Sequence, residues 1–455
     1  MEDPDPSRAL SRVLDAAENA SPLDAVEAVT RELAAALGAG AAFFLIEDLS
    51  GQGLIRLSHA SGGDAEGVFT ARTGEEDATV RFDAAEQAVV LPFDGGPAEL
   101  AVRSQTLQVV APADRADDQA DDQAYDQAHD QAHDQAHGAT RASAQRWTVL
   151  TPVTERGEVL GLLELTLPRE PDAAILAEIR RIGHVLSFVI IANRRHTDLF
   201  EWGQRTARFS LPAEIQRRLL PSAFTCEAGA FALSAWLEPA ASVGGDSFDY
   251  SLARDTLHLS ISDAMGHGVA SALNATLCVG SLRNTRRGGA SLLEQATTTN
   301  RMMCQHATDT GSEGFATGLV ARLDLRTSRL SMVNAGHIAP YLCRSGTVTP
   351  IQLPADLPFG LFPDAEYHST DLVLEPGDRL MLVTDGMLER NAAALDLPAE
   401  IGTTIGLHPR EATRDLTRKV VAIAGAALSD DATVMVLDWY GGHGRERRTA
   451  MGSAR

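Results

Sequence analysis

Four short aspartate motifs stand in one order across the second half of the chain and constrain its fold more than any other feature. Each aspartate lies at the edge of an apolar run, where a β-strand would end and a loop would begin. Distant strand ends must then meet at one place if the carboxylates act together. The motifs are Gly244-Gly245-Asp246, Ser262-Asp263-Ala264, Thr384-Asp385-Gly386 and Asp430-Asp431-Ala432.

Carboxylates gathered from separate segments suit hard divalent cations, because Mg²⁺ and Mn²⁺ prefer oxygen ligands. Two such ions activate a water molecule and neutralise the oxygens of a phosphoryl group. In-line attack by that water needs no cysteine nucleophile. The motifs therefore predict hydrolysis of phosphate esters at a site with two Mn²⁺ or Mg²⁺ ions. The glycines beside the aspartates let the backbone pass close to the ions without a Cβ clash.

Length, charge and cysteine content indicate the number of domains and exclude several classes of protein. A chain of 455 residues suits two or three domains. The formal net charge of −23 argues against a nucleic-acid-binding surface, which needs clustered Lys and Arg. The four cysteines show no CxxC spacing, which argues against a disulfide scaffold or a zinc site and suits a reducing cytosol.

The sequence offers no signal for export or membrane insertion. The N-terminus is acidic and lacks the basic start and apolar stretch of a signal peptide. The longest apolar run, residues 185–192, is too short to cross a bilayer. We therefore expect a cytoplasmic protein without a membrane or nucleic-acid partner.

The first part of the chain reads as a small α/β domain. Residues 8–38 have helical spacing, with Ser21 and Pro22 expected as a cap and a first helical residue. Residues 147–153 and 159–167 predict a hairpin, and one long helix is expected from Asp172 to about residue 208. Further strands are expected at 41–48, 54–59, 67–71, 87–92 and 106–111.

This order of elements, with the phrase from Thr151-Pro152-Val153 to Leu163-Glu164-Leu165, resembles a GAF domain and leads us to expect a GAF-like sensor domain over residues 8–195. The resemblance implies that this domain senses a small ligand or mediates contact in a homodimer. A structural dimerisation module without a ligand stays open as the alternative.

Three segments are expected to lie outside the two domains. Residues 116–138 repeat a four-residue polar unit, which predicts a disordered insertion, because a tract without apolar residues cannot form a core. A metal held by His129, His133 and His137 on one helical face is the alternative. Residues 196–222 are expected to form a linker helix that transmits a signal or simply packs, and residues 441–455 a disordered tail.

The second half of the chain, residues 223–440, predicts many strands and few helices. Strands are expected at 230–237, 256–263, 316–324, 329–335, 340–344, 371–374, 379–384 and 432–440, and helices at 270–285, 291–308 and 409–427. This pattern predicts an α+β class in which two sheets form a sandwich flanked by helices.

The aspartate motifs, together with Asn334-Ala335-Gly336-His337 and Pro376-Gly377-Asp378, closely resemble the SpoIIE/RsbU-like branch of the metal-dependent protein phosphatases, relatives of the type-2C enzymes. The resemblance implies that two Mn²⁺ or Mg²⁺ ions assist removal of phosphate from phosphoserine or phosphothreonine on a protein. In this branch the usual substrate is a phosphorylated anti-sigma-factor antagonist. Carried over motif by motif, the metal ligands and catalytic residues are Asp246, Asp263, Asp385 and Asp430, with the backbone carbonyl of Ala264 as a further metal ligand.

Other residues near the motifs have two readings. Asp249 and Asp431 are expected as additional ligands or as partners of the ligands. His267 is expected either to protonate the leaving seryl oxygen or to cap backbone groups. Asn334 and His337 are expected to fix a turn beneath the site. An aspartate beside glycine is often only turn chemistry, which is the reading we prefer for Asp378.

The two resemblances therefore imply a sensor-regulated serine/threonine protein phosphatase. One alternative is a phosphatase-like scaffold that binds a signalling partner without turnover. A second is a small-molecule phosphatase, which we disfavour because nothing resembles a cap that closes over a pocket.

Overall fold

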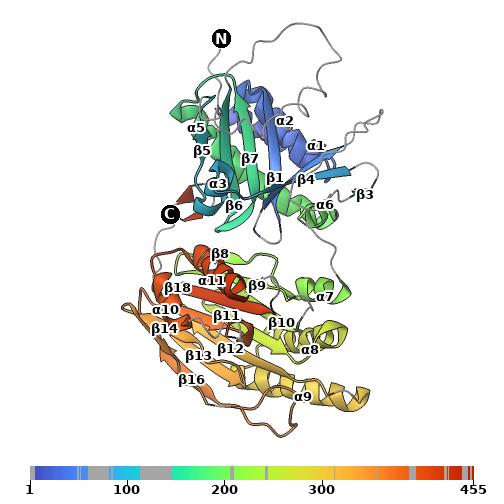
Figure 1. Cartoon of the computed structure of the whole chain (residues 1–455), viewed down its shortest axis with the longest axis vertical. Helices are drawn as coiled ribbons and strands as arrows, with labels where there is room; N and C mark the ends of the chain where they lie inside the picture. The colour runs from blue at the N-terminus through green and yellow to red at the C-terminus, as the bar shows by residue number, and fades with distance from the viewer. Residues whose placement is uncertain are drawn as a thin grey trace. The chain divides into compact units, whose positions relative to one another are not determined.

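The computed structural model divides the chain into two compact units, one of residues 1–207 with 448–455 and one of residues 208–447 (Figure 1). The predicted strand at 67–71, the repeat at 116–138 and its three histidines lie outside the described residues. The described residues are 6–48, 51, 53–59, 81–83, 86–112, 146–204, 210–240, 244–311, 313–354, 356–388, 396–424, 428, 430–442, 449–450 and 453–454.

The N-terminal unit is built on an antiparallel sheet. Its strand order among the described residues is β3-β4-β2-β1-β7-β6-β5. The predicted hairpin of β6 and β7 is confirmed, with Pro152 opposite Leu162. The strands are β1 (Ala41–Glu47), β2 (Gly53–His59), β3 (Arg81–Asp83), β4 (Glu86–Pro92), β5 (Gln108–Val110), β6 (Trp147–Glu155) and β7 (Glu158–Leu167).

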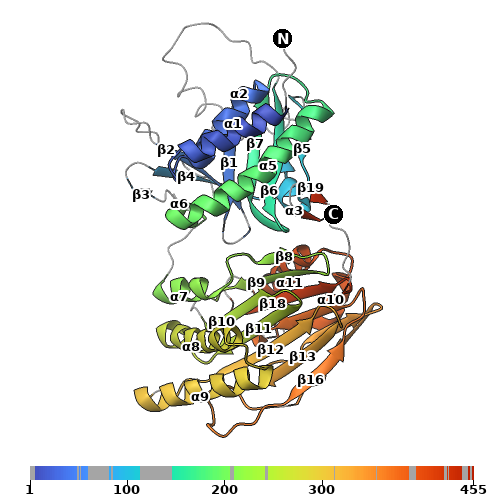
Figure 2. The same ribbon diagram turned by 180° about the vertical axis from the view of Figure 1, so that it is seen from behind.

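The two faces of this sheet are covered differently. Figure 2 shows α1 (Pro6–Asn19), α2 (Ala25–Leu37) and α5 (Ala173–Asn193) lying across one face. Their apolar side chains form one core with alternate residues of the strands, Leu163 and Leu165 among them. The short helix α3 (Pro97–Ser104) covers part of the other face through Ala101 and Val102. The expected order of helix, strands, hairpin and exit helix is thus present, α3 was not predicted, and the likeness to a GAF domain stays a prediction.

Two expectations about helix ends were wrong. Helix α2 begins at Ala25 with Asp24 as its N-cap, because Ser21 donates from Oγ to Asp24 Oδ2 at 2.6 Å and closes a turn first. The long helix from Asp172 ends at Asn193 and is followed by a 3₁₀ turn, η2 (Arg194–His196). Thr197 then has extended backbone and accepts from Leu199 N, a local bond that competes with helix.

The linker at 196–222 is therefore not one helix. It contains α6 (Leu199–Gly203) and α7 (Leu211–Leu219), and residues 205–209 between them lie outside the described part. Ser210 caps α7 by accepting from Ala213 N, and Pro212 stands in its first turn, a common start for a helix.

The C-terminal unit is a β-sandwich, as predicted. One sheet has the order β10-β11-β12-β13-β16 and the other β15-β14-β17-β18-β9-β8. The first sheet contains β10 (Asp246–Leu252), β11 (Thr256–Ala264), β12 (Ala316–Asp324), β13 (Arg329–Ala335) and β16 (Ser369–Val373). The second contains β8 (Thr225–Glu227), β9 (Phe231–Glu238), β14 (Tyr341–Arg344), β15 (Thr347–Pro350), β17 (Arg379–Val383) and β18 (Ala432–Trp439).

The main core of this unit lies between the two sheets, where Phe248 of β10 packs in one cluster with Phe231 and Trp439 of the second sheet. Helices α8 (Gly268–Arg287) and α9 (Leu292–Thr310) cover the outside of the first sheet, and α11 (Pro409–Ala424) covers the second. The capping box of Ser291 and Glu294 starts α9 close to its predicted position. Strands β8, β10 and β15 and the short helix α10 (Leu397–Thr403) were not predicted.

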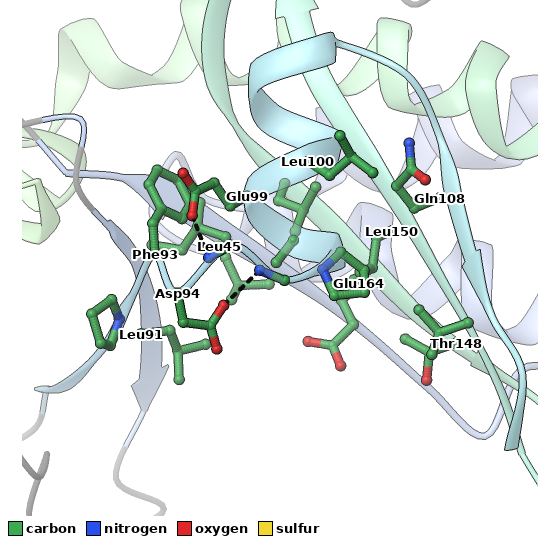
Figure 3. Close-up of a pocket in the computed structure, with 18 of the residues that line it drawn as sticks. Leu45, Leu91, Phe93, Asp94, Glu99, Leu100, Gln108, Thr148, Leu150 and Glu164 are labelled. Carbon is green, nitrogen blue, oxygen red and sulfur yellow. Dashed lines mark hydrogen bonds between the residues drawn. The ribbon is translucent and has the colours of Figure 1, made fainter. Parts of the chain in front are cut away.

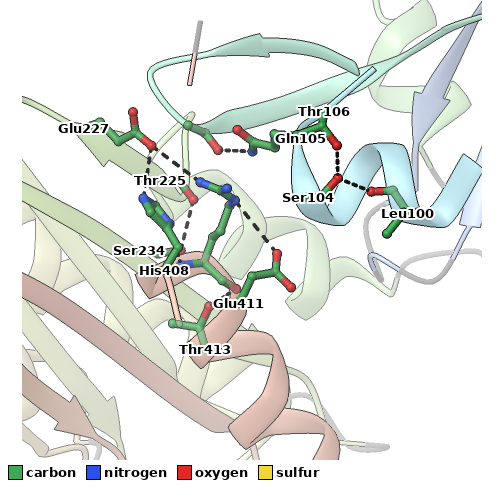
Figure 4. A network of polar contacts seen from close by, with 12 residues as sticks. Leu100, Ser104, Gln105, Thr106, Thr225, Glu227, Ser234, His408, Glu411 and Thr413 are labelled. Carbon is green, nitrogen blue, oxygen red and sulfur yellow. Dashed lines mark hydrogen bonds and ion pairs between the residues drawn. The ribbon is translucent and has the colours of Figure 1, made fainter. Parts of the chain in front are cut away.

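Charged side chains connect the start of α11 to β8 (Figure 4). His408 Nε2 lies 3.0 Å, and Arg410 Nη1 3.5 Å, from the buried carboxylate of Glu227. Burial lowers the pKa of His408 and outweighs the opposing effect of Glu227.

Two further findings concern membrane-spanning helices and the C-terminal tail. Within the described residues, no helix is both long enough and apolar enough to cross a membrane. In the predicted disordered tail, β19 (Thr449–Ala450) pairs with β20 (Ser453–Ala454), so that expectation was wrong for these four residues.

Candidate active site

Asp246 and Asp263 are brought together by strand register. Asp246 is the first residue of β10, and the antiparallel pairing of β10 with β11 sets it directly opposite Asp263. Facing residues of an antiparallel pair have neighbouring side chains on the same face of the sheet. Phe248 and Ile261 form another facing pair, and both point into the core. The two aspartates therefore lie at the end of the sandwich interior.

Two threonines of the second sheet hold the Asp246 carboxylate. Thr384, which follows β17, and Thr433 of β18 each donate from Oγ1 to Asp246 Oδ2 at 2.6 Å. Thr433 N also donates to Thr384 Oγ1 at 2.9 Å. The other carboxylate oxygen of Asp246, Oδ1, accepts no hydrogen bond from the described residues. The pair of threonines thus crosslinks the two sheets and leaves one oxygen of Asp246 available.

Three glycines bring the four motifs into contact. A Cβ added to Gly244 would lie 2.8 Å from Asp430 Oδ1, and one on Gly245 would lie 2.2 Å from the Ala264 carbonyl oxygen. A Cβ on Gly386 would lie 2.0 Å from the Asp431 carbonyl oxygen. Any side chain at these positions would force the segments apart.

Asp431 lies beside this cluster and is satisfied by the protein itself. It is fully buried, and it accepts from Ala240 N at Oδ1 (2.8 Å) and from Gln216 Nε2 at Oδ2 (2.5 Å). Gln216 also donates to the backbone carbonyl of Asp246 at 3.0 Å. Because Gln216 belongs to α7, the helix before the sandwich contacts the site directly.

The site carries surplus negative charge. Burial raises the pKa of Asp246 well above its usual range, and Asp263 and Asp431 raise it further against the opposing hydrogen bonds of the threonines. Burial, followed by Asp385, Asp430 and Asp431, raises the pKa of Asp263 to about 7. These carboxylates therefore lie close enough to oppose one another's ionisation, and a bound cation would relieve that repulsion.

The donor set matches a hard divalent cation, since it consists of carboxylate oxygens and the Ala264 carbonyl in a cradle that only glycine allows. In this conformation, no three His, Cys, Asp or Glu side chains of the described part are gathered in ligand geometry. The register and the glycine contacts bring the four motifs close together, while the closer arrangement of ligands is not formed among the described residues.

The other predicted site residues lie as follows. The Ala264 carbonyl accepts from Ser271 Oγ at 3.0 Å and keeps its second lone pair. His267 is the exposed N-cap residue of α8, and its side chain makes no capping hydrogen bond, so the capping alternative was wrong. Its role as a general acid stays a prediction.

Asn334 and His337 fix a turn, as expected, through Asn334 Nδ2 to His337 O (2.9 Å) and His337 N to Asn334 Oδ1 (2.7 Å). His337 Nδ1 also lies 2.8 Å from Thr317 Oγ1, and Thr317 pairs with Asp263 in the sheet. The turn therefore braces the strand beside the site.

Asp249 and Asp378 lie apart from the site. Asp249 makes ion pairs with Arg283 (2.8 Å) and Arg286 (2.9 Å) of α8, because its odd position on β10 turns it to the helix-covered face. Asp378 accepts from Glu375 N at 2.7 Å and from Arg344 Nη2 at 2.6 Å, as expected of turn chemistry.

Sequence reasoning missed the parts played by Thr384, Thr433 and Gln216. The two threonines belong to the Thr-Asp-Gly and Asp-Asp-Ala-Thr motifs, but the sequence alone indicates no function for them. Gln216 lies thirty positions before Asp246 and had no local signal.

The chain is similar in part to several known proteins. Residues 253–440 match the family model described as Stage II sporulation protein E (SpoIIE). The chain is 26% identical over 195 residues to phosphoserine phosphatase RsbP of Bacillus subtilis (strain 168), which covers 42% of this chain and 46% of RsbP. It is 22% identical over 237 residues to phosphoserine phosphatase RsbU of the same organism, covering 51% of this chain and 70% of RsbU.

Among solved structures, the RsbU and RsbW domains of Rv1364c from Mycobacterium tuberculosis match with a TM-score of 0.41 and 23% identity, over 49% of this chain and 62% of that one. The PP2C phosphatase domain of SpoIIE from Bacillus subtilis, solved with a fragment of its regulatory domain, matches with a TM-score of 0.40 and 20% identity, over 48% of this chain and 64% of that one. The chain spans about half the length of RsbP, the first of these curated relatives.

Proposed function

We propose, from the match of residues 253–440 to the SpoIIE family model, that the chain is a metal-dependent serine/threonine phosphoprotein phosphatase. The observation that carries the proposal is Asp246, which is buried, opposite Asp263 and crosslinked to the second sheet by two threonine hydroxyls. A protein gains little stability by burying a carboxylate among other carboxylates. Such a cluster is instead characteristic of a functional site.

Asp246, Asp263, Asp385, Asp430 and the Ala264 carbonyl would hold two ions, Mn²⁺ or Mg²⁺. When bound, such a pair supplies an activated water and neutralises phosphoryl oxygens.

The protein's own contribution is positioning. The two threonines keep the Asp246 carboxylate in one orientation, and Asp431 keeps its hydrogen bonds to Ala240 and Gln216. We assign His267, exposed at the start of α8, to protonation of the leaving seryl or threonyl oxygen.

The names of two relatives support our proposal for the substrate class. Two of them are named phosphoserine phosphatases. We propose a phosphorylated protein of the anti-sigma-factor antagonist kind as the substrate, with turnover switching a sigma factor on.

We further propose that the N-terminal unit and the linker at 196–222 regulate turnover. Gln216 of α7 supports this, because it joins the linker to Asp431 and to the Asp246 backbone. A ligand or partner can change the site through α7 if it binds one position of α7 more tightly than another. The population of molecules with α7 in that position then increases. Removal of residues 1–195 should change the turnover rate, and an unchanged rate would count against regulation.

The test is phosphate release by the full chain from a serine-phosphorylated protein such as casein, with Mn²⁺ titrated in and then removed by EDTA. We expect activity that depends on the metal and falls by at least about a thousandfold in Asp246→Asn and Asp385→Asn. Asp371→Asn is the matched control, because Asp371 is half-exposed on β16 and bonds only to Ser331 and Arg329 among the described residues. Metal binding without any phosphate release would reject the proposal.

The scaffold alternative has one observation in its favour, which is that the described carboxylates are not in ligand geometry. A scaffold would keep its signalling output after Asp246→Asn and Asp385→Asn. An enzyme would lose both signalling and phosphate release.

A further inference from the structure

The described residues include a cavity and an exposed apolar surface, either of which could receive a molecule. The cavity, of about 590 Å³, lies beside α3 in the N-terminal unit (Figure 3). Two of its lining carboxylates are already paired with arginines, Glu99 with Arg103 and Glu164 with Arg56, so its charge selects no class of ligand. The apolar surface lies on the C-terminal unit, beside the proposed active site, and it does indicate a class of partner.

The apolar surface consists of five side chains that are between 40% and 54% exposed. Single exposed apolar residues are common on proteins, whereas a group of them marks a surface for interaction. We call these five residues the apolar rim, and backbone contacts show that they lie together. The members of the rim are Met265, Val269, Leu273, Leu361 and Phe362.

Three members of the rim lie at the start of α8. Met265 directly follows Ala264, whose carbonyl is a proposed metal ligand, and His267 precedes the first residue of the helix. Val269 and Leu273 are four residues apart, so they share one face of α8. This group therefore begins at the proposed active site and extends along the helix.

The other two members belong to a loop whose backbone is held by α9. Gly360 N donates to Asn300 Oδ1 at 2.8 Å, and Asn300 Nδ2 donates to the carbonyl oxygen of Phe362 at 2.9 Å. Asn300 is a buried residue of α9. Leu361 lies between the two residues that this amide holds. The loop therefore presents Leu361 and Phe362 to solvent from a backbone that is fixed at two points.

Gly314 and Phe315 connect the loop with the start of α8. The carbonyl oxygen of Phe315 accepts from Met265 N at 2.9 Å. A Cβ added to Gly360 would lie 3.2 Å from the carbonyl oxygen of Gly314 and 3.5 Å from the Cα atom of Phe315. The two groups of the rim are thus linked through one short segment.

The loop lies close to the Ala264 carbonyl. Phe359 pairs with Ala316, and Ala316 pairs with Ala264 in the sheet. Two strand spacings place the loop roughly 10 Å from Ala264. An extended peptide spans about 3.3 Å for each residue, so a side chain three positions from a phosphoserine bound at the site would reach the loop.

The surface around the rim carries little charge. Residues 264–282 and 357–363 contain no Asp, Glu, Lys or Arg, although 22% of the chain is charged. The centres of protein interfaces are likewise depleted of charged residues and enriched in Met and Phe. The rim is therefore suited to apolar side chains of a partner, whereas the phosphate belongs to the carboxylate site beside it.

We propose that the apolar rim binds the polypeptide of the phosphoprotein substrate, through apolar side chains within about three residues of the phosphoserine. The inference rests on the proposed function and adds a sequence preference to it. A second copy of the chain fits this surface less well, because a copy seated on Met265 and beside His267 would obstruct the approach to the site.

The experiment compares two phosphoserine peptides of equal length. They differ only at the second and third positions on each side of the phosphoserine, which are leucine in one peptide and asparagine in the other. Phosphate release by the full chain with Mn²⁺ gives kcat/KM for each. We expect the leucine peptide to be the better substrate by at least about tenfold, through a lower KM, since removing one leucine side chain from water contributes a factor of this size.

Two variants test the assigned residues, and a third is the matched control. Phe362→Ser and Leu273→Ser should each reduce the preference for the leucine peptide about three- to tenfold, because each removes apolar area from the rim. Val373→Ser should keep the wild-type preference. Val373 is also about half-exposed, but it pairs with Arg329 at the opposite end of the same sheet from Ala264.

Peptide binding is also measured without turnover. The unphosphorylated form of each peptide carries fluorescein, and its anisotropy is followed as metal-free protein is added. The leucine peptide should bind at least about tenfold more tightly than the asparagine peptide. Phe362→Ser should remove most of that difference. This readout does not require a working active site.

Equal kcat/KM values for the two peptides overturn the proposal, while hydrolysis of p-nitrophenyl phosphate leaves the proposed function standing. If neither peptide nor p-nitrophenyl phosphate releases phosphate, the proposed function fails, and equal anisotropy titrations then overturn the rim as well. Light scattering gives the oligomeric state. Loss of a dimer in Phe362→Ser with an unchanged preference would assign the rim to contact between copies instead. Thermal unfolding shows whether each variant is folded, and either rim variant alone suffices.

Discussion

The substitution Gly245→Ala tests whether the site depends on close passage of two backbone segments. The added Cβ would lie 2.2 Å from the Ala264 carbonyl oxygen and 2.4 Å from Ser271 Oγ. Ordinary contact begins at 3.4 Å, so the strand end and the Ala264 segment must separate by about 1.2 Å, the difference of 3.4 and 2.2. The serine hydroxyl can rotate away, but the carbonyl belongs to the backbone of β11.

Forced overpacking of a buried position costs about 1–3 kcal/mol of unfolding free energy. A displacement of about 1 Å at a reaction centre costs about a hundredfold in rate. We therefore expect Gly245→Ala to lower stability by about 2 kcal/mol in urea denaturation and kcat for phosphate release by about a hundredfold.

Gly280→Ala is the matched control. Gly280 lies inside α8 and an added Cβ there meets nothing within 4 Å, so alanine should stabilise the protein by about 0.5–1 kcal/mol. The reasoning is refuted if Gly245→Ala unfolds at the wild-type urea concentration and keeps activity within about threefold.

Three more predictions follow from the same contacts. Thr433→Val should weaken Mn²⁺ binding by about ten- to a hundredfold in calorimetry, because Asp246 loses a hydroxyl donor, and Thr433→Ser should restore it. Without metal, stability should fall as pH rises, since burial and neighbouring carboxylates raise the pKa of Asp263 to about 7 in the folded state against 3.8 unfolded. This contribution is full below pH 3.8 and lost by about pH 7; urea titrations that show stability rising over this range would disprove it. Asp249→Ala should cost about 2–3 kcal/mol of unfolding free energy, because two arginines of α8 lose their carboxylate partner, while Mn²⁺ affinity stays at the wild-type value.

Local pattern was sufficient for most of the sandwich. Strands β12 and β13 fall at their predicted limits, since alternating apolar residues mark a strand with one buried face. Strand β10 was missed because its residues, Asp246 to Leu252, are mostly polar. Its place in the sheet depends on its pairing with β11, which local β-propensity does not predict.

Helix ends were predictable where the cap was local. Asp172 caps α5 and the Ser291–Glu294 box caps α9, both within four residues of sequence. The break after Asn193 was not predicted, because the residues around it are tolerated in helices and none of them is a strong helix-stop residue; the bond from Leu199 N to Thr197 Oγ1 marks the break in the structure.

The sequence by itself determined which residue types could form the site, since four aspartates beside glycines and apolar runs already name an oxygen-ligand chemistry. Tertiary structure decided which carboxylates share that site and what holds them. Asp246 and Asp249 are three residues apart, yet one faces Asp263 and two threonines while the other faces the arginines of α8. Gln216 reaches the site from α7, a helix that contains none of the four aspartate motifs. The reason is physical, because a strand's period fixes which face a side chain takes, but only packing fixes what lies across from that face.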